Sequence, residues 1–314
     1  MLTPQISAPK LAQAIGLQTE LFIKREDQNP FGSHKGRSIP LMIEKYADNG
    51  ATSFVISSSG NAAIAATKYI AKRPDLALTV FVGENIDETK RMEILRFAQD
   101  DKVQVKQVAN PKQSAFQMAK TSGVINLRQS TDDSALVGYK ELARELAEIK
   151  NLSAVFIPTS SGTTAQGLYL GFQKLGVNPQ IHIVQTTACH PMINKSKIKD
   201  QNTGCEPAVA KIDADELDPT AYSWRNDNAE KSLASAIVDK VAHRKNKIFE
   251  ILKNSQGNGW VATNDDIQNA IALTKQNENI DISPNSALAL VGLRQALAHG
   301  CKFNGPVVII ITGR

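Results

Sequence analysis

The stretch Lys24-Arg-Glu-Asp-Gln-Asn-Pro-Phe-Gly-Ser-His-Lys35-Gly-Arg37 decides how this sequence is interpreted. It follows the strand-like run Leu21-Phe-Ile23, turns at Asn29-Pro-Phe-Gly32 and enters a helical pattern at Lys35. An ammonium group in the first turn of a helix faces the positive end of the helix dipole, which disfavours its protonated form. A partly neutral amine attacks carbonyls, so this position suits a Schiff base. For a lysine considered alone, a surface residue after a turn would be the simpler interpretation.

Two distant segments have a similar layout: a predicted strand, a hydroxyl-rich turn and a helix. They are Ser58-Ser59-Gly60-Asn61 and Ser160-Ser161-Gly162-Thr163-Thr164. The first turn, taken alone, is interpreted most simply as an ordinary helix start, because Ser and Asn are common caps. Backbone N–H groups and hydroxyls at such turns also bind carboxylate or phosphate groups. The sequence contains neither Gly-x-x-x-x-Gly-Lys nor Gly-x-Gly-x-x-Gly, so a nucleotide is the weaker explanation for a phosphate.

A lysine in a first helical turn and a phosphate-binding turn together suggest pyridoxal phosphate, which is bound through both. The last predicted strand, Val307-Val-Ile-Ile-Ile-Thr312, adds a hydroxyl after a buried-type apolar run. A buried hydroxyl at that point should meet a polar partner. A strand that simply reaches solvent is the alternative for this one threonine.

These segments, in this order, resemble the fold-type II (tryptophan synthase β-like) pyridoxal phosphate enzymes, and within that family the threonine synthase branch. The resemblance implies that Lys35 is the Schiff-base lysine and that Asn61 contacts the ring oxygen of the cofactor. It also implies that Ser160, Ser161, Gly162, Thr163 and Thr164 hold the phosphate and that Thr312 meets the pyridine nitrogen. Ser58, Ser59 and Gly60 would contact the substrate carboxylate. His34, Arg37 and the basic residues of 187–247 are candidates for a second anion site.

The chemistry implied by the resemblance is that of a lyase acting on a small amino acid. Lys35 would remove the Cα proton as general base. In threonine synthase, phosphate then leaves O-phosphohomoserine and water adds to give threonine. Three residues depart from that pattern: Gly36 replaces an aspartate, Thr163 replaces a glycine and Ser283 replaces a glutamate. These departures weaken the substrate assignment more than the cofactor assignment.

Other functions remain open at the level of sequence. Cysteine synthase-like β-replacement and serine or threonine dehydration use the same cofactor and fold, and fold does not fix function. A non-catalytic ligand-binding homologue is a further alternative, motivated by the loss of an acidic residue at Ser283. A metal site at Cys189-His190 and Cys205 is disfavoured because the spacing matches no zinc pattern.

Apolar runs of strand and helix type alternate along the chain, which predicts an α/β fold with mostly parallel sheets between helical layers. We expect strands at 21–24, 53–57, 77–82, 103–108, 154–158, 181–185 and 307–312. Helical patterns cover 36–48, 61–72, 87–98, 111–121, 133–149, 164–175, 229–253, 264–276 and 285–299. We expect a large cofactor-binding domain of residues 1–36 and 142–314 and a smaller mobile domain of residues 37–141 that closes the cleft.

Composition excludes several function classes. The net charge of +5 is dispersed and its densest runs lack interleaved aromatics, so no nucleic-acid partner is expected. No apolar stretch reaches the roughly 20 residues that span a bilayer, and no membrane association is expected. Three widely spaced cysteines favour a reducing compartment, hence the cytoplasm. The family resemblance implies a homodimer.

Overall fold

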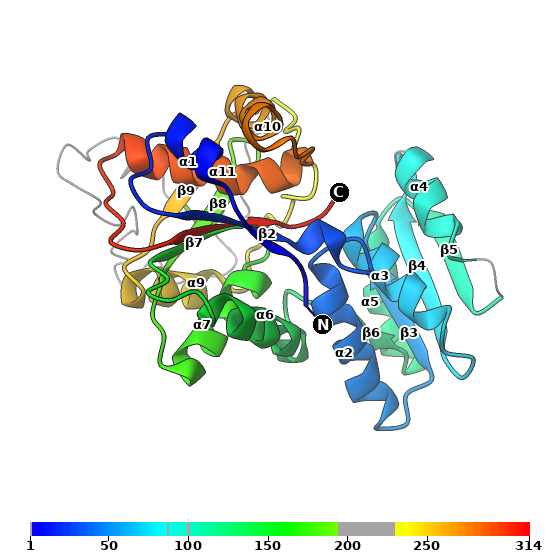
Figure 1. Cartoon of the computed structure of the whole chain (residues 1–314). Helices are drawn as coiled ribbons and strands as arrows, with labels where there is room; N and C mark the ends of the chain where they lie inside the picture. Colours follow the sequence, from blue (N-terminus) through cyan, green and yellow to red (C-terminus); the bar gives the residue numbers. More distant parts are fainter. Residues whose placement is uncertain (1, 87, 99–100, 194–229) are drawn as a thin grey trace, which may run out of the picture. The chain divides into compact units, whose positions relative to one another are not determined.

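The computed structural model describes residues 2–86, 88–98, 101–193 and 230–314, which form two compact units (Figure 1). Unit 1 comprises Gln28–Tyr139, and unit 2 comprises Leu2–Asp27 and Lys140–Arg314. Each unit is an α/β structure with its own sheet. The domain boundaries expected from the sequence, and the motion of the smaller domain, stay predictions.

Unit 1 is built on a four-stranded parallel sheet in the order β5-β4-β3-β6. The strands are β3 (Ser53–Ser57), β4 (Ala77–Gly83), β5 (Val103–Val108) and β6 (Ile125–Asn126). Side chains alternate along β3: Phe54 and Ile56 join the core beneath the helices α2 (Lys35–Ala47), α3 (Asn61–Ile70) and α4 (Glu88–Leu95). Val55 faces the other way and packs with Ala115 of α5 (Pro111–Ser122). Helices therefore cover both faces of this sheet.

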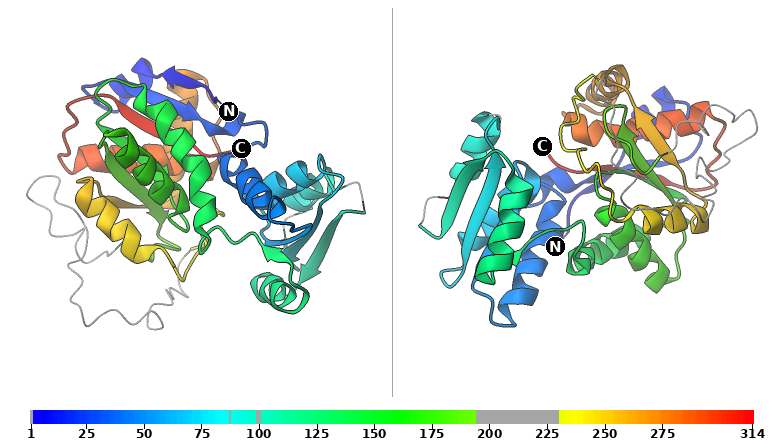
Figure 2. Two further views of the ribbon diagram at one scale, coloured as in Figure 1. Left: turned by 90° about the horizontal axis from the view of Figure 1, so that it is seen from below. Right: turned by 180° about the vertical axis from the view of Figure 1, so that it is seen from behind.

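Unit 2 is built on a six-stranded sheet in the order β1-β2-β10-β7-β8-β9, in which only β1 is antiparallel to its neighbour. The strands are β1 (Gln5–Ser7), β2 (Leu21–Arg25), β7 (Ala154–Pro158), β8 (Gln180–Thr186), β9 (Gly259–Ala262) and β10 (Val307–Ile311). One face carries α1 (Pro9–Ala14), α10 (Asn264–Glu278) and α11 (Pro284–Ala298). The other carries α6 (Val137–Ala147), α7 (Thr163–Leu175) and α9 (Lys245–Asn254) (Figure 2). Two short 3₁₀ helices, Glu26–Gln28 and Asp133–Leu136, complete the described elements.

The expected α/β fold with parallel, two-sided sheets is confirmed. All seven expected strands are present, and three of them have the expected bounds. Helix α10 begins with a capping box, in which the Thr263 side chain accepts from Asp266 N and the Asp266 side chain accepts from Thr263 N. The sequence patterns did not predict β1, α1, β6 or β9, all of which are short elements. Short elements give too few residues for a period to be recognised.

The expected helix over 229–253 is wrong, because within the described residues 230–253 only α9, at its end, is helical. Residues 233–242, here called the strap, form no helix and no strand (yellow in Figure 1). Side chains from elsewhere in unit 2 accept hydrogen bonds from its backbone N–H groups; Asn264 Oδ1, for example, lies 2.9 Å from Leu233 N. In a helix these N–H groups would donate to the carbonyl four residues back. In the strap, these N–H groups donate to side chains that are distant in the sequence, so the hydrogen bonds of a helix do not form.

Candidate active site

Lys35 is the first residue of α2, as the sequence predicts. Its backbone N–H donates to Ser33 Oγ at 3.3 Å, so the turn before the helix helps to hold its first residue. The neighbouring side chains Ser33, His34 and Arg37 are buried, whereas Lys35 is half-buried. The Lys35 side chain is therefore more accessible than the three side chains around it.

Gly36, one of the three departures from the resemblance, has a packing reason. A Cβ atom at this position would lie 2.2 Å from Asn29 Oδ1 and 2.7 Å from Phe31 Cβ. Asn29 in turn holds the loop: its Oδ1 accepts from Phe31 N at 3.0 Å, and its carbonyl oxygen accepts from Gly32 N at 2.6 Å. Because the loop rests directly on the first turn of α2, only glycine fits at position 36 without a shift.

A second segment, residues 129–138, packs against the first turns of α2. Ser38 Oγ donates to the Ala135 carbonyl at 2.7 Å and accepts from Gln129 Nε2 at 2.8 Å. A Cβ atom on Gly138 would lie 1.8 Å from the Arg37 carbonyl oxygen, so the two backbones touch. Sequence reasoning missed this contact. The glycine in the first turn of a helix was the available signal, since helix interiors disfavour glycine unless packing requires it.

The carboxyl-terminal end of α2 is attached to the same segment. Tyr46 Oη donates to Asp132 Oδ2 at 2.8 Å. This hydrogen bond to the carboxylate raises the pKa of Tyr46 above its ordinary value. Asp132 Oδ1 meanwhile caps the following 3₁₀ helix by accepting from Ser134 N at 2.9 Å. The helix that presents Lys35 is thus attached to this segment near both of its ends.

The Ser58–Asn61 turn joins β3 to α3, and it is open. Gly60 is the residue before the helix, with extended backbone angles and no atom within 4 Å of where a Cβ would be. Ser58 Oγ accepts from Gly60 N at 3.2 Å, within the turn itself. Ser59 is exposed and Asn61 is half-buried. The free amides at the start of α3 are therefore accessible to an anion.

Topology brings Lys35 and this turn to one edge of unit 1. Helix α3 follows β3, so it begins at the carboxyl end of that strand. Helix α2 precedes β3 and runs back against it, so its first residue lies at the same end. Helices α2 and α3 pack together on one face of the sheet. Ligand sites of parallel α/β sheets lie at this carboxyl edge.

The Ser160–Thr164 turn joins β7 to α7, and it is firmly supported. Gly162 has φ +81°, and a Cβ atom there would lie 2.7 Å from Ile248 Cγ1 of α9. Ser161 Oγ and Thr163 Oγ1 are hydrogen-bonded at 2.8 Å. Both hydroxyls and the first amides of α7 are donors of the kind that bind phosphate.

Ser160, the first residue of this turn, has a further role that the sequence did not indicate. Its Oγ lies 3.2 Å from the backbone nitrogens of Val238 and Asp239 in the strap, and it accepts a hydrogen bond from each. The expectation that Ser160 serves the phosphate stays a prediction.

Thr312 follows β10, the strand next to β7, so it lies at the same carboxyl edge of unit 2. It is buried, and its Oγ1 lies 3.4 Å from Ser286 Oγ in the first turn of α11. Ser283, another departure from the resemblance, caps this helix, and its Oγ lies 2.8 Å from the Gly313 carbonyl oxygen. Thr312 therefore has hydroxyl neighbours in this turn, and the expected polar partner is present.

Lys24 and Arg25, at the start of the 24–37 stretch, have structural roles in this fold. Lys24 is buried, and its Nζ lies 2.6 Å from Glu145 Oε2 and 2.8 Å from the Thr3 carbonyl oxygen. Arg25 forms two hydrogen bonds with the Asp27 carboxylate, at 2.7 and 2.8 Å, which raise the pKa of the guanidinium group. A buried ammonium group needs such partners.

Unit 2 also contains a buried neutral histidine in β8. His182 stacks on Phe156 with ring centres 4.3 Å apart, and burial lowers the pKa of His182 to about 3. Trp260 Nε1 donates to His182 Nδ1 at 3.1 Å, so the ring proton is on Nε2, 3.0 Å from Gln180 Oε1. This side chain lies in the core and not with the candidate site residues.

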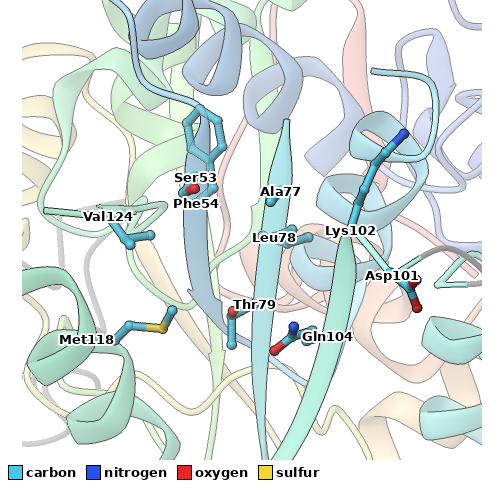
Figure 3. Close-up of a pocket in the computed structure, with 10 residues that line it drawn as sticks. All are labelled: Ser53, Phe54, Ala77, Leu78, Thr79, Asp101, Lys102, Gln104, Met118 and Val124. Carbon is cyan, nitrogen blue, oxygen red and sulfur yellow. The ribbon is translucent and has the colours of Figure 1, made fainter. Parts of the chain in front are cut away.

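A shallow cavity of about 190 Å³ lies at the opposite edge of unit 1 (Figure 3). Ser53 and Ala77, the first residues of β3 and β4, line it together with Met118 of α5. It is thus at the amino ends of the strands, whereas Ser58 to Asn61 follow the carboxyl end of β3. This position separates the cavity from the candidate active site.

Among the residues that the structure describes, no group of three or more His, Cys, Asp and Glu side chains could hold a metal ion. Cys205, part of the disfavoured metal site, lies outside the described residues. Of the other two cysteines, Cys189 is a buried free thiol and Cys301 is buried. No helix in the described ranges is long and apolar enough to cross a membrane.

Comparison with known proteins decides the family. The model of the pyridoxal-phosphate dependent enzyme family matches residues 2–313. This chain belongs to that family. Its cofactor is pyridoxal phosphate, and its fold is that of the fold-type II (tryptophan synthase β-like) enzymes.

Individual relatives differ in activity. A threonine synthase of Methanosarcina acetivorans is 24% identical over 323 residues, covering 99% of this chain and 73% of the relative. The human L-serine dehydratase/L-threonine deaminase is 27% identical over 181 residues, covering 55% of this chain and 53% of the relative. The crystal structure of a pyridoxal 5'-phosphate-dependent aspartate racemase shares the fold with a TM-score of 0.77 at 17% identity, covering 100% of this chain and 90% of that one.

The residues present fit pyridoxal phosphate. The turn before α7 offers hydroxyls and helix-terminal amides for a phosphate group, and it contains a glycine with a left-handed backbone. Thr163, the departure at this turn, is buried and bonded to Ser161. Thr312 offers a hydroxyl for a ring nitrogen, and Lys35 offers a primary amine at a helix start.

Proposed function

We propose that this protein is a pyridoxal phosphate-dependent lyase that converts O-phosphohomoserine to threonine. The observation that carries the proposal is similarity to threonine synthase along 99% of the chain, which includes every candidate loop. In this proposal Lys35 Nζ binds the cofactor covalently and later accepts the substrate Cα proton. Asn61 contacts the ring oxygen, Thr312 the ring nitrogen, and Ser160, Ser161, Gly162, Thr163 and Thr164 the phosphate.

The cofactor, when bound, supplies an electron sink for the carbanion formed at the amino-acid Cα. The residues of this chain then set the direction of the reaction. Lys35 is the first residue of α2, and its primary amine would act as the base that takes the Cα proton. Thr312 is a neutral hydroxyl beside Ser286, which cannot stabilise a protonated ring nitrogen as a carboxylate would. Elimination and replacement are therefore favoured over transamination.

We assign the substrate carboxylate to Ser58, Ser59 and Gly60, because this turn is accessible and presents the start of α3. O-phosphohomoserine also carries a phosphate, which needs a second group of donors. His34 and Arg37 stay candidates for it. Both side chains are buried at the start of α2, and both are near neighbours of Lys35 in the sequence.

The decisive experiment combines cofactor trapping with product analysis. Borohydride reduction of the purified holoprotein, followed by peptide mass analysis, should find pyridoxyl phosphate on Lys35. In a separate assay, unreduced holoprotein should release inorganic phosphate from O-phosphohomoserine and yield threonine. Lys35→Ala should abolish both signals, whereas Lys45→Ala, which removes an exposed lysine from the same helix, should change neither.

A second candidate function is serine or threonine dehydration, or cysteine synthase-like β-replacement. The similarity to the human L-serine dehydratase/L-threonine deaminase supports dehydration. Serine, threonine and O-acetylserine should be assayed beside O-phosphohomoserine. Trapping at Lys35 with ammonia release from serine or threonine, and no phosphate release, would replace the threonine synthase proposal with this one.

The different-class alternative is a non-catalytic ligand-binding homologue. Its motive is Ser283, which stands in place of an acidic residue. In the structure Ser283 caps α11 and contacts the Gly313 carbonyl group, so the serine has a structural role of its own. Failure to trap any cofactor on Lys35 would favour this alternative over both enzymatic ones.

We further propose a homodimer in the cytoplasm, with a large domain of residues 1–36 and 142–314 and a smaller mobile domain of residues 37–141. These features come from the family resemblance and from composition. Sedimentation of the holoprotein at several concentrations measures the oligomeric state.

A further inference from the structure

The strap, residues 233–242, is attached to unit 2 through its backbone. Ala236 N donates to Asn285 Oδ1 at 2.9 Å. Val238 N and Asp239 N both donate to Ser160 Oγ at 3.2 Å. Three closely spaced amides of an irregular segment are thus bonded by two side chains that lie 49 or more residues away in sequence.

The strap crosses the carboxyl edge of the six-stranded sheet. Ala234 and Ile237 are buried in the core on the face of α10 and α11. Ala242 is buried in the core on the opposite face, with α7 and α9. A chain that contributes to both cores must pass over an edge of the sheet between them. The bonds to Ser160, which follows β7, identify this edge as the carboxyl one.

The two attachment points lie beside two different parts of the proposed cofactor site. Asn285 is in the first turn of α11, next to Ser286, whose Oγ is 3.4 Å from Thr312 Oγ1. Ser160 opens the turn proposed to hold the phosphate. The strap is therefore fixed at the ring-nitrogen side by Asn285 and at the phosphate side by Ser160.

The hydrogen-bond capacity of Ser160 makes its role specific. A serine hydroxyl accepts two hydrogen bonds and donates one. Both acceptor positions of Ser160 are used by the strap amides, so its proton is what remains for an anion. The hydroxyl can therefore accept hydrogen bonds from the strap and donate one to a phosphate at the same time.

We propose that Ser160 and Asn285 are positioning residues that hold the strap across the cofactor site and thereby set how tightly pyridoxal phosphate is retained. The inference rests on the proposed placement of the cofactor. It assigns to Asn285 a role that neither the sequence pattern nor the comparisons supplied. Ser160 gains a second role, in addition to its proposed contact with the phosphate.

The first test needs no cofactor. Hydrogen exchange of the apoprotein, followed by mass spectrometry, should show protected amides in the strap. Ser160→Ala and Asn285→Ala should each raise exchange there by about tenfold or more, because local opening becomes easier. Ser160→Thr and Asn285→Asp keep an acceptor oxygen and should restore protection. Ser161→Ala is the matched control, since its hydroxyl contacts Thr163 and not the strap.

The second test measures cofactor retention. Asn285→Ala should raise the dissociation constant of pyridoxal phosphate by about tenfold, although Asn285 itself is not a proposed cofactor ligand. Asn285→Asp should restore it. Unchanged exchange in both alanine variants, or raised exchange with unchanged cofactor affinity, would overturn the proposal. A wild-type protein that leaves Lys35 unmodified after borohydride would instead defeat the proposed function, while the exchange result would still report on the strap.

Discussion

The same tripeptide, Ser-Ser-Gly, opens two helices of this protein and does different work in each. Before α3, the hydrogen bond seen among the described residues lies within the turn: Ser58 accepts from Gly60, and the glycine has extended backbone angles and open space around it. Before α7 the turn is supported from outside, by α9 against Gly162 and by the strap on Ser160. An accessible turn suits a substrate that enters and leaves with every cycle. A supported turn suits a group that stays.

Local sequence determines the conformation of each turn, whereas tertiary contacts determine how rigid the turn is. Both turns follow a buried strand and both present helix-terminal amides. The difference lies in residues that are remote in sequence, such as Ile248 and Asp239. We therefore expect equivalent substitutions in the two turns to have unequal effects.

The largest contrast is expected between Gly162→Ala and Gly60→Ala. At Gly162 an alanine meets a left-handed backbone and Ile248 at 2.7 Å, so the free energy of unfolding should fall by about 2–4 kcal/mol. At Gly60 neither obstacle exists, and the change should stay within about 1 kcal/mol. Urea unfolding followed by circular dichroism measures both. Equal losses would contradict the distinction between the turns.

Because of His182, the free energy of unfolding should decrease more steeply as the pH falls. This residue is neutral in the folded protein, with a pKa of about 3, and its value in an unfolded chain is 6.5. The unfolded chain therefore binds the proton first, so this contribution is complete above pH 6.5 and is lost as the pH falls towards 3. At pH 4.5 the loss should be about 3 kcal/mol.

His182→Asn is the matched variant for this prediction. It cannot titrate, so its free energy of unfolding should change less between pH 7 and 4.5, whatever its absolute stability. The difference between the two curves isolates the histidine from the carboxyl groups. Parallel curves would show that His182 is hydrated or protonated in the folded protein.

The smallest effect on stability is expected from Ser58→Ala. The lost hydrogen bond, 3.2 Å to Gly60 N in a half-buried turn, should cost no more than about 1 kcal/mol. Its effect on catalysis should be larger, with KM for the amino-acid substrate rising several-fold and cofactor affinity unchanged. If Ser58→Ala instead lowered the affinity for the cofactor and left KM unchanged, the roles assigned to the two turns would be reversed.

Sequence alone predicts much of this fold because the relevant signals are local. Buried strands such as β3 and β7 are continuous apolar runs, and both end at the small polar residues that form the turns. The position of Lys35 at the start of α2 is local in the same sense, since a Pro-Phe-Gly turn precedes it. The cofactor followed from combining these segments.

The rest could not be predicted because its causes are distant. Residues 229–244 have a helical pattern, yet Asn285 and Ser160 bond the amides that a helix would use, from positions 49 and 78 residues away. Gly36 departs from the resemblance because Asn29 and Phe31 leave no room for a Cβ, a contact that no sequence pattern displays. Both cases depend on contacts that form only once the chain has folded.

A segment held through its backbone is also a segment whose outward side chains can change. Leu233, Val238 and Val241 of the strap are exposed, and none of them supplies a side-chain hydrogen bond that fixes the strap in place. Variation at these three positions should leave the course of the chain intact. Natural diversification of this protein would meet the least structural resistance at the same points.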